Sequence, residues 1–395
     1  MKKQILILLT LFLALSAASQ TMKQTVHYLA SAELQGRKPL SKGDTLARQY
    51  IAARFEKMRL KPLFDTWFQE VRLTKDGVEK AISSNVVAVL EGNDAKLKKE
   101  YVVVGAHFDH LGINSIYSMS KDTIGVHYGA DDNASGVALM LQMAEMMSKG
   151  GSARSLIFVA FTCEEQGLLG SAYFVEHLPI KKEQIVAMVN YDMVGKLRDN
   201  TISVGGSGTS LEAEQMIKQA AEACNLKVKL EPSGMGPSDH ASFYAKEIPV
   251  FFIHTTADST YHTPNDKAEF LNYEGMDLIA RFASKLLGNI TSKEDRLTFQ
   301  RSIDPVKSNP AKMKATLGIM PDHSGTTNGV KVEIVSKDRA AERAGVKAGD
   351  LIVEINGEKI GDLYQYMEAL SRIDADQTKI KVVRDNKTIE LIIKF

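Results

Sequence analysis

Three apolar runs, separated by segments of helical character, constrain the fold of this chain more than any other feature. They cover Tyr101–Ala106, Ser155–Phe161 and Ile185–Asn190, and most residues in them are apolar. Strands with this pattern are buried on both faces, whereas a strand with one face in water alternates apolar and polar residues. The segments Ala134–Met147 and Leu168–Leu178 are predicted to be helices. The sequence therefore predicts an α/β fold whose sheet is covered by helices on both faces.

The rest of the first 290 residues continues this pattern of strands and helices. In the segment 41–59, Leu46, Ile51 and Phe55 recur at helical spacing. Between residues 66 and 91 we expect strands joined at a hairpin turn, Asp76-Gly77. Further helices are predicted at 21–30, 209–224 and 273–287, and a further strand at 249–253.

The first 19 residues have the order of a secretory signal peptide. A basic start, Met1-Lys2-Lys3, precedes an apolar run from Ile5 to Leu15 and then the small residues Ser16–Ser19. The run is shorter than the roughly 20 apolar residues that span a bilayer, although an uncleaved anchor is the alternative interpretation. We expect an exported protein, periplasmic or secreted, with no membrane anchor after cleavage of the signal.

A change in the sequence pattern divides the remaining chain. We assign residues 20–290 to the α/β domain and residues 291–312, which begin with a polar stretch and contain Pro305 and Pro310, to a linker. Residues 313–395 read as short strands with glycine-rich turns, which predicts a separate β-rich module of about 80 residues. In this module we expect strands at 329–335, 350–355, 380–383 and 389–395, and a helix at 362–370.

Acidic side chains and histidines gather just after the predicted strands of the α/β domain. Because ligands of open α/β sheets bind at the carboxyl ends of the strands, these residues should meet at one edge. Each has a simpler explanation alone; Asp131 and Asp132, for example, open a predicted helix, where carboxylates act as N-caps. Together they require compensating positive charge. The residues are His107 and Asp109, Asp131 and Asp132, Glu164 and Glu165, Asp192, and Tyr261 and His262.

The composition narrows what this group of residues can bind. Two cysteines cannot form a disulfide scaffold or a four-thiolate zinc site, and we expect Cys163 to be a buried free thiol rather than paired with Cys224. The 49 Lys and Arg nearly balance the 48 Asp and Glu, which gives no electrostatic case for a nucleic-acid partner. Imidazole and carboxylate are zinc ligands, and two-metal sites hold their ions roughly 3.5–4 Å apart. The inventory therefore suits two divalent metal ions.

Five motifs carry a resemblance to a known family. In chain order they are Ala106-His107-Phe108-Asp109, Gly129–Gly136, the run from Phe161 to Ser171, Asn190-Tyr191-Asp192-Met193 and Tyr261-His262-Thr263-Pro264. This set resembles the co-catalytic zinc aminopeptidases, family twenty-eight of the metallopeptidases, over about residues 22–290. The resemblance implies a mixed β-sheet sandwiched by helices and a cofactor of two zinc ions.

The resemblance also implies which residues would hold the two zinc ions. Asp131 would bridge them. His107 and Asp192 would complete one metal site, whereas Glu165 and His262 would complete the other.

Four further residues would support the chemistry, according to the same resemblance. Glu164 would be the general base that takes a proton from the attacking water and returns it to the leaving amine. Asp109 would accept the second ring proton of His107, Asp132 would follow a cis peptide bond, and Tyr261 would stabilise the oxyanion. The implied substrates are peptides with a free N-terminus.

Residues 313–395 resemble a bacterial PDZ domain. The resemblance rests on Leu317-Gly318-Ile319-Met320, on the run Ala340–Ile352 and on Ile355-Asn356-Gly357. A PDZ domain binds an extended peptide as an added strand and captures its terminal carboxylate in a loop. The resemblance implies that Leu317–Met320 is this loop and that the partner is a C-terminal peptide; packing on the α/β domain is the alternative role.

Other functions remain open at this point. A single-zinc glutaminyl cyclase or a carboxypeptidase of the same fold would use similar ligands. A catalytically inactive binding protein with a PDZ domain is the non-enzymatic alternative, although the residues expected for all five ligands and for the base are present.

Overall fold

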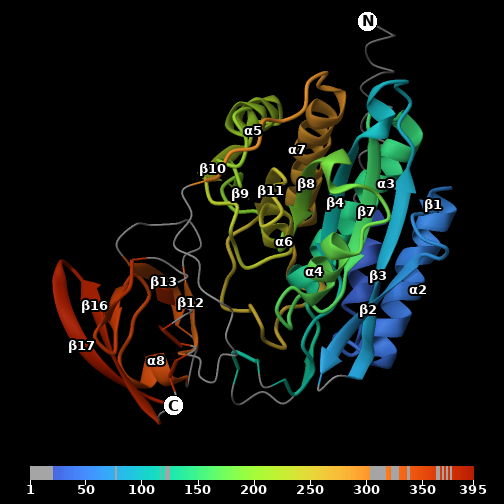
Figure 1. The fold of residues 1–395 in the computed structure, drawn as a ribbon. Coiled ribbons are helices and arrows are strands. Elements are labelled where there is room, and N and C mark those ends of the chain that lie inside the picture. The colour runs from blue at the N-terminus through green and yellow to red at the C-terminus, as the bar shows by residue number, and fades with distance from the viewer. Residues whose placement is uncertain are drawn as a thin grey trace, which may run out of the picture. The chain divides into compact units, whose positions relative to one another are not determined.

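The computed structural model of the chain describes residues 21–75, 78–115, 117–120, 125–302, 317–321, 329–335, 339–361, 365–366, 369–370, 372–373 and 376–395. The chain divides into two compact units (Figure 1). The first comprises residues 1–115, 125–257 and 264–302, and the second comprises residues 116–124, 258–263 and 303–395. The expected signal peptide, the Asp76-Gly77 turn and residues 303–312 of the expected linker lie outside the described residues.

A mixed β-sheet of nine strands forms the centre of the first unit. In spatial order its strands are β1 (Lys61–Pro62), β3 (Val78–Leu90), β7 (Ser155–Phe161), β4 (Tyr101–His107), β8 (Ile185–Tyr191), β11 (Val250–His254), β9 (Thr201–Gly205) and β10 (Lys227–Glu231), with β2 (Phe68–Lys75) paired to β3. Strands β7, β4, β8 and β11 run parallel, whereas β3 and β9 are antiparallel to their inner neighbours. The four parallel strands therefore end at the same edge of the sheet. A short hairpin of β5 (Gly112–Ile113) and β6 (Val126–His127) stands apart from this sheet.

Helices cover both faces of this sheet (Figure 1). The helix formed by residues 21–29, α2 (Lys42–Lys57), α3 (Gly136–Gly150), α5 (Ala213–Ala223) and α7 (Tyr273–Ser292) contribute to the core on one face, and α4 (Leu169–Glu176) and α6 (His240–Tyr244) to the core on the other. Successive side chains of β4 enter opposite cores. Val102 and Val104 belong to the first core, whereas Val103 belongs to the second, with Phe174 of α4. The continuous apolar runs are buried on both sides, so the predicted fold class is confirmed.

Side-chain caps fix the beginnings of two of these helices. The hydroxyl oxygen of Ser41 accepts a hydrogen bond from the backbone N–H of Asp44 at the start of α2. The amide oxygen of Asn272 accepts one from the backbone N–H of Gly275 at the start of α7. Such bonds satisfy N–H groups that the first turn of a helix leaves without a partner.

The sequence did not predict strands β9 and β10. Strand β10 lies at the edge of the sheet, and Lys227 and Lys229 on it are exposed. Both strands are five residues long and alternate polar and apolar residues, so they lack the continuous apolar run by which the other strands of the sheet were found. Within the expected linker, α7 continues to Ser292, and the backbone of residues 298–300 hydrogen-bonds to residues 209–211.

The C-terminal part of the second unit is a small β-sheet with its own core. Its strands are β12 (Ile319–Pro321), β13 (Val330–Val335), β14 (Leu351–Ile355), β16 (Gln377–Arg384) and β17 (Lys387–Lys394), in that spatial order, with β15 (Glu358–Lys359) paired to β14. The four strands predicted here are thus present. A short helix, α8 (Ala340–Arg343), was not predicted. Of the predicted helix at 362–370, residues 365–366 and 369–370 are described, and they are helical.

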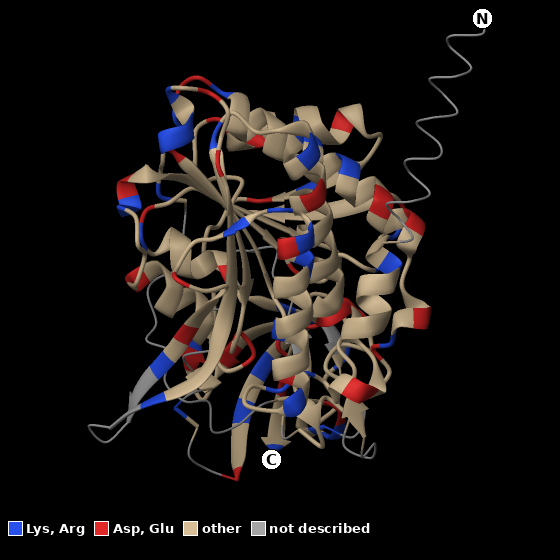
Figure 2. Ribbon diagram, turned by 90° about the vertical axis from the view of Figure 1, so that its right-hand side faces the viewer, with Lys and Arg blue, Asp and Glu red and all other residues tan. Residues whose placement is uncertain are grey.

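Three further predictions concern charge, cysteines and membrane segments. Figure 2 shows Lys, Arg, Asp and Glu spread over helices and loops with both signs mixed. Cys163 is buried, and both it and Cys224 are free thiols. Within the described residues, no helix has the length and apolar character needed to cross a bilayer.

Candidate metal centre

Three neighbouring parallel strands place acidic and histidine side chains at one edge of the sheet. Strand β4 ends at His107, and Asp192 directly follows β8. Glu164 follows β7 after a turn in which Cys163 has a left-handed backbone conformation, with φ 56°. Asp132 belongs to the irregular segment Ala130–Ser135 that leads into α3.

His107, Glu164 and Asp192 form a first cluster, whose ligand atoms all lie within 4.8 Å of one another. The Nε2 atom of His107 is 3.3 Å from Oδ1 of Asp192 and 3.9 Å from Oε2 of Glu164. It is also 3.3 Å from Oδ1 of Asp132. One imidazole nitrogen therefore faces three carboxylates.

His110, Asp132 and Glu165 form a second cluster beside the first. The Nδ1 atom of His110 is 2.7 Å from Oε1 of Glu165 and 3.8 Å from Oδ2 of Asp132. The two carboxylate oxygens of Asp132 thus face different clusters: Oδ1 faces His107 and Oδ2 faces His110. A carboxylate in this position can bridge two metal ions.

Asp131, which was expected to bridge, has different surroundings. It is buried, and its Oδ1 accepts a hydrogen bond from the backbone N–H of Gly195 at 2.7 Å. The backbone N–H groups of Asp131 and Asp132 both donate to the carboxylate of Asp266. The cis peptide bond also lies one residue later than expected, between Asp132 and Asn133. In the structure it is therefore Asp132, one position after the residue that the resemblance implies, that faces the other ligands.

Asp109 contacts both Glu164 and His107 of the first cluster, but its carboxylate does not accept the ring proton of His107 as the resemblance implies. Its Oδ1 accepts a hydrogen bond from the backbone N–H of Glu164 at 3.1 Å. The Nδ1 atom of His107 is 3.2 Å from the backbone carbonyl oxygen of Asp109 and 3.8 Å from its carboxylate. The ring proton of His107 is therefore directed at the carbonyl rather than at the carboxylate. This contact still orients the ring so that Nε2 faces the other ligands.

Tyr261 and His262 lie on the loop 258–263, which groups with the second unit. Their rings stack with centroids 3.9 Å apart. The backbone carbonyl of His262 accepts a hydrogen bond from the backbone N–H of Met119 at 2.9 Å. The roles expected for Tyr261 and His262 stay predictions.

The described part of the expected PDZ loop is tightly packed. Leu317 and Ile319 are buried, and the strand β12 begins at Ile319 and includes Met320. Gly318 has φ 76°, a left-handed conformation that favours glycine.

The electrostatics of the clusters indicate a shortage of positive charge. Burial raises the pKa of Glu164 well above its usual value, and burial also raises the pKa of Asp109 to about 8. Burial alone would lower the pKa of His107, but the charges of Glu164 and Asp192 raise it well above its usual value. Buried carboxylates that bind protons this tightly would be stabilised by metal cations. The donor set of imidazoles and carboxylates, with one carboxylate shared, fits a pair of zinc ions.

Two side chains behind the clusters fix the backbone of the ligand segments. Arg37 is fully buried and donates hydrogen bonds to the carbonyls of Phe108, Tyr128 and Gly129. The carboxylate of Asp266 accepts hydrogen bonds from the backbone N–H groups of Asp131 and Asp132. Sequence reasoning gave neither residue a role, because the partners named here lie 70 or more positions away along the chain.

Sequence reasoning also gave no role to His110. The only sequence feature that pointed to His110 was its position directly after the motif residues His107 and Asp109. Its partner Glu165 is 55 positions away along the chain. Only the folded chain shows that these two side chains meet.

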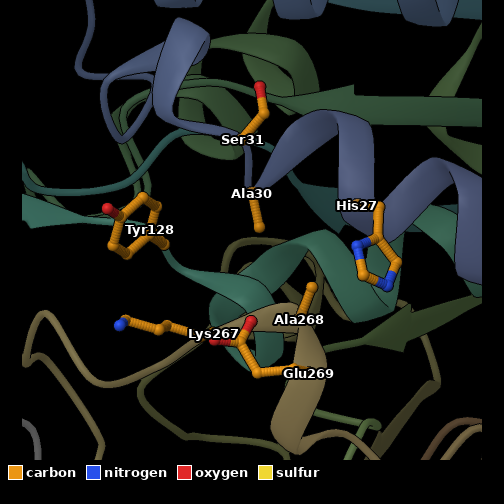
Figure 3. Close-up of a pocket in the computed structure, with 7 residues that line it drawn as sticks. All are labelled: His27, Ala30, Ser31, Tyr128, Lys267, Ala268 and Glu269. Atoms are coloured by element: carbon orange, nitrogen blue, oxygen red, sulfur yellow. The ribbon is translucent and has the colours of Figure 1, made fainter.

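A separate cavity of about 260 Å³ lies near the segment that precedes the aspartate pair (Figure 3). It is lined by His27, Ser31, Tyr128, Lys267 and Glu269, among others. Lys267 lies over the ring of Tyr128, with its Nζ 5.7 Å from the centroid. None of the cluster residues lines this cavity, so it is distinct from the candidate metal centre.

Comparison with known proteins places this fold and these motifs in a family. The model of peptidase family M28 matches residues 85–287, about half of the chain. The chain belongs to peptidase family M28. This range contains the residues of both clusters in the M28 chain. A PDZ domain model matches residues 315–395, so the M28 region is followed by a C-terminal PDZ domain.

Individual relatives agree with this assignment. The M28 chain is 27% identical to aminopeptidase YwaD of Bacillus subtilis over 242 residues, which cover 58% of this chain and 49% of that protein. It thus spans about half the length of that curated relative.

Among solved structures, the Legionella pneumophila LapA aminopeptidase is 23% identical, has a TM-score of 0.56, and covers 71% of this chain and 74% of its own. A Bacteroides thetaiotaomicron glutaminyl cyclase is 16% identical, has a TM-score of 0.57, and covers 70% of this chain and 97% of its own. At these identities the structural matches establish the fold alone.

Proposed function

We propose that this protein is an exported, zinc-dependent aminopeptidase with two metal ions, which hydrolyses the N-terminal residue from peptides. The observation that carries the proposal is the pair of adjacent ligand clusters that share Asp132. A carboxylate with one oxygen toward each cluster suits a two-metal hydrolase better than a one-metal enzyme. The family membership supports the reaction class.

The proposed ligands follow from the distances. Asp132, in place of Asp131, would bridge the two ions, and His107 and Asp192 would complete the first site. Glu165 would belong to the second site, with His262 as its histidine. Among the described residues His110 is hydrogen-bonded to Glu165 at 2.7 Å, so we assign it the task of orienting that carboxylate.

When bound, the zinc ions would supply Lewis acidity, which makes an attacking water more acidic and a peptide carbonyl more electrophilic. Glu164 would take the proton from that water at Oε2, the oxygen that faces His107. It would then give the proton to the nitrogen of the leaving peptide, so that one carboxylate serves first as base and then as acid. The hydroxyl of Tyr261 would donate a hydrogen bond to the developing oxyanion.

The surplus of carboxylates at the site also supports the preference for a free N-terminus. The α-ammonium group of a peptide is a cation, and Asp192 lies at the border of the first cluster with a side chain that is 12% exposed. A peptide with an acetylated N-terminus lacks this charge. It should therefore bind poorly and be cleaved slowly.

The second candidate is a single-zinc glutaminyl cyclase, favoured only by the likeness of the fold. The two reactions have different products: hydrolysis of a peptide releases an amino acid, whereas cyclisation of an N-terminal glutamine releases ammonia and leaves the peptide intact. Incubation of the zinc-loaded protein with leucyl, glutaminyl and N-acetyl-leucyl peptides, followed by mass spectrometry, separates them. We expect free leucine to be released at an appreciable rate from the leucyl peptide and not from the N-acetyl-leucyl peptide. Cyclised glutaminyl peptide without hydrolysis of the leucyl peptide would overturn the proposal.

A further inference from the structure

The second unit connects the PDZ domain to the loop that carries Tyr261 and His262. This unit contains residues 116–124, the loop 258–263 and the PDZ domain. The segment 117–120 forms hydrogen bonds with both of the other two parts. Ser118 and Met119 donate to the carbonyl of His262, at 3.5 Å from Oγ and at 2.9 Å from the backbone N–H.

On the PDZ side, Arg339 contacts this segment. The guanidinium of Arg339 donates a hydrogen bond to the backbone carbonyl of Ser118. Two adjacent residues therefore join three segments, because the carbonyl of Ser118 contacts the PDZ domain while its hydroxyl and its neighbour Met119 contact His262.

The same arginine lies against the loop expected to bind a terminal carboxylate. A Cβ atom added to Gly318 would be 2.2 Å from Cβ of Arg339, so the loop packs directly on the arginine stem. The backbone N–H of Ala341 also donates to the carbonyl of Leu317 at 2.8 Å, which fixes the loop to the start of α8. Arg339 thus borders both the loop and the segment that contacts His262.

Arg339 retains a hydrogen-bond donor for a ligand. Its Nε atom is buried and has no acceptor among the described residues. A guanidinium has five N–H donors in a fixed planar arrangement, so it can donate to Ser118 and to a carboxylate at the same time. A peptide carboxylate held by the loop 317–320 would satisfy the buried Nε and restrict the arginine.

We propose that Arg339 is a positioning residue that couples the binding of a C-terminal peptide at the PDZ domain to the loop of Tyr261 and His262. A bound carboxylate orders Arg339, Arg339 orders Ser118, and Ser118 with Met119 orders the carbonyl of His262. This inference rests on the proposed function, in which His262 holds the second zinc ion. Coupling between two sites is reciprocal, so zinc strengthens peptide binding by the same factor as the peptide strengthens zinc binding.

The test measures peptide affinity with and without zinc, which needs no turnover. The probe is a hexapeptide that ends in valine with a free carboxylate and has fluorescein on its N-terminus, so that it lacks the free amine of a substrate. Fluorescence anisotropy gives its Kd for the full chain, first stripped of metal by a chelator and then loaded with zinc. We expect zinc to lower the Kd at least fivefold. The matching peptide amide should bind much more weakly in both states.

Two variants make the test specific. In Arg339→Gln we expect weaker peptide binding and no effect of zinc on the Kd. Arg343→Gln is the matched control, because Arg343 ends the short helix α8 that Arg339 precedes but donates to the carbonyl of Lys394; it should behave as the wild type. Arg339→Lys keeps the charge but loses the planar fork, so it should restore binding only in part.

The outcomes separate this inference from the function on which it rests. A wild-type Kd that zinc does not change, a zinc effect that persists in Arg339→Gln, or no binding of the peptide would each overturn the coupling. The zinc content of the same samples tests the proposed function independently. Two zinc ions per chain without coupling would refute this inference alone, whereas fewer than two would refute the two-metal centre as well.

Discussion

Asp131 and Asp132 are adjacent and buried, yet their carboxylates have different tasks. Asp131 accepts a backbone hydrogen bond from Gly195, whereas Asp132 has one oxygen toward His107 and the other toward His110. The first arrangement is typical of a side chain that holds a loop, and the second of a shared metal ligand. Substitution by asparagine distinguishes them, since it keeps the size of the side chain but removes the charge.

We predict that Asp132→Asn loses both zinc ions at concentrations that saturate the wild type. Loss of a ligand charge from each site should weaken metal binding at least 10- to 100-fold. Asp131→Asn should keep two zinc ions per chain, because its carboxylate does not face the clusters. Zinc content after dialysis against a fixed free-zinc buffer measures both. The reverse pattern would restore Asp131 as the bridging residue.

A second pair of adjacent residues gives a prediction about the proton transfer. Glu164→Gln should keep both zinc ions but lower kcat about 10²- to 10⁴-fold, because glutamine cannot accept the proton of the attacking water. Glu165→Gln is the matched control in the neighbouring position, and it should lose zinc from the second site. Zinc content and kcat on a leucyl peptide are measured together. Near-wild-type turnover of Glu164→Gln would show that another residue is the base.

At the level of elements, a buried arginine joins the N-terminal segment to the exits of two ligand segments. Arg37 donates to the carbonyls of Leu29, Phe108, Tyr128 and Gly129, and burial lowers its pKa to about 10. These carbonyls lie next to β4 and just before the aspartate pair. Without Arg37 the carbonyls of Leu29, Phe108 and Tyr128 would lose this donor, whereas that of Gly129 would keep the backbone N–H of Ala134.

We therefore predict that Arg37→Met lowers the free energy of unfolding by about 3 kcal/mol or more, because each buried carbonyl without a donor costs about 1–3 kcal/mol. The control is Arg301→Met, which removes an exposed ion pair with Glu247 and should cost about 1 kcal/mol at most. Denaturant unfolding of the full chain measures both variants. Equal, small effects would mean that Arg37 contributes little to the fold.

Particular elements show what the sequence could predict. Strands β4, β7 and β8 were predicted to within one residue, because strands buried on both faces are continuous apolar runs. The edge strand β10 was missed, since it is short and alternates polar with apolar residues instead of forming a continuous apolar run. The motifs identified His107, Glu164 and Asp192, which the structure brings together. The resemblance implied Asp131 as the bridge, whereas Asp132 faces both clusters, and no motif indicated His110; both features depend on the backbone path and on contacts between distant positions.

At the scale of the whole molecule, the proposed zinc ions should be part of the stability of the fold. Removal of the ions would leave several buried carboxylates close together without compensating charge. A ligand that binds only the folded state stabilises it by about 2.7 kcal/mol at a concentration one hundred times its Kd. We therefore predict that such a zinc concentration raises the melting temperature of the chelator-treated protein by about 5–10 °C. Magnesium at the same concentration is the control and should have little effect, and an equal shift would argue against imidazole-containing sites.

The most direct measurement of the central claim is a crystal structure of the zinc-loaded full chain with anomalous diffraction data collected at the zinc edge. The account predicts two anomalous peaks roughly 3.5–4 Å apart, with the carboxylate of Asp132 between them. His107 and Asp192 should contact one peak, and Glu165 and His262 the other. A single peak, or two peaks bridged by a residue other than Asp132, would contradict it.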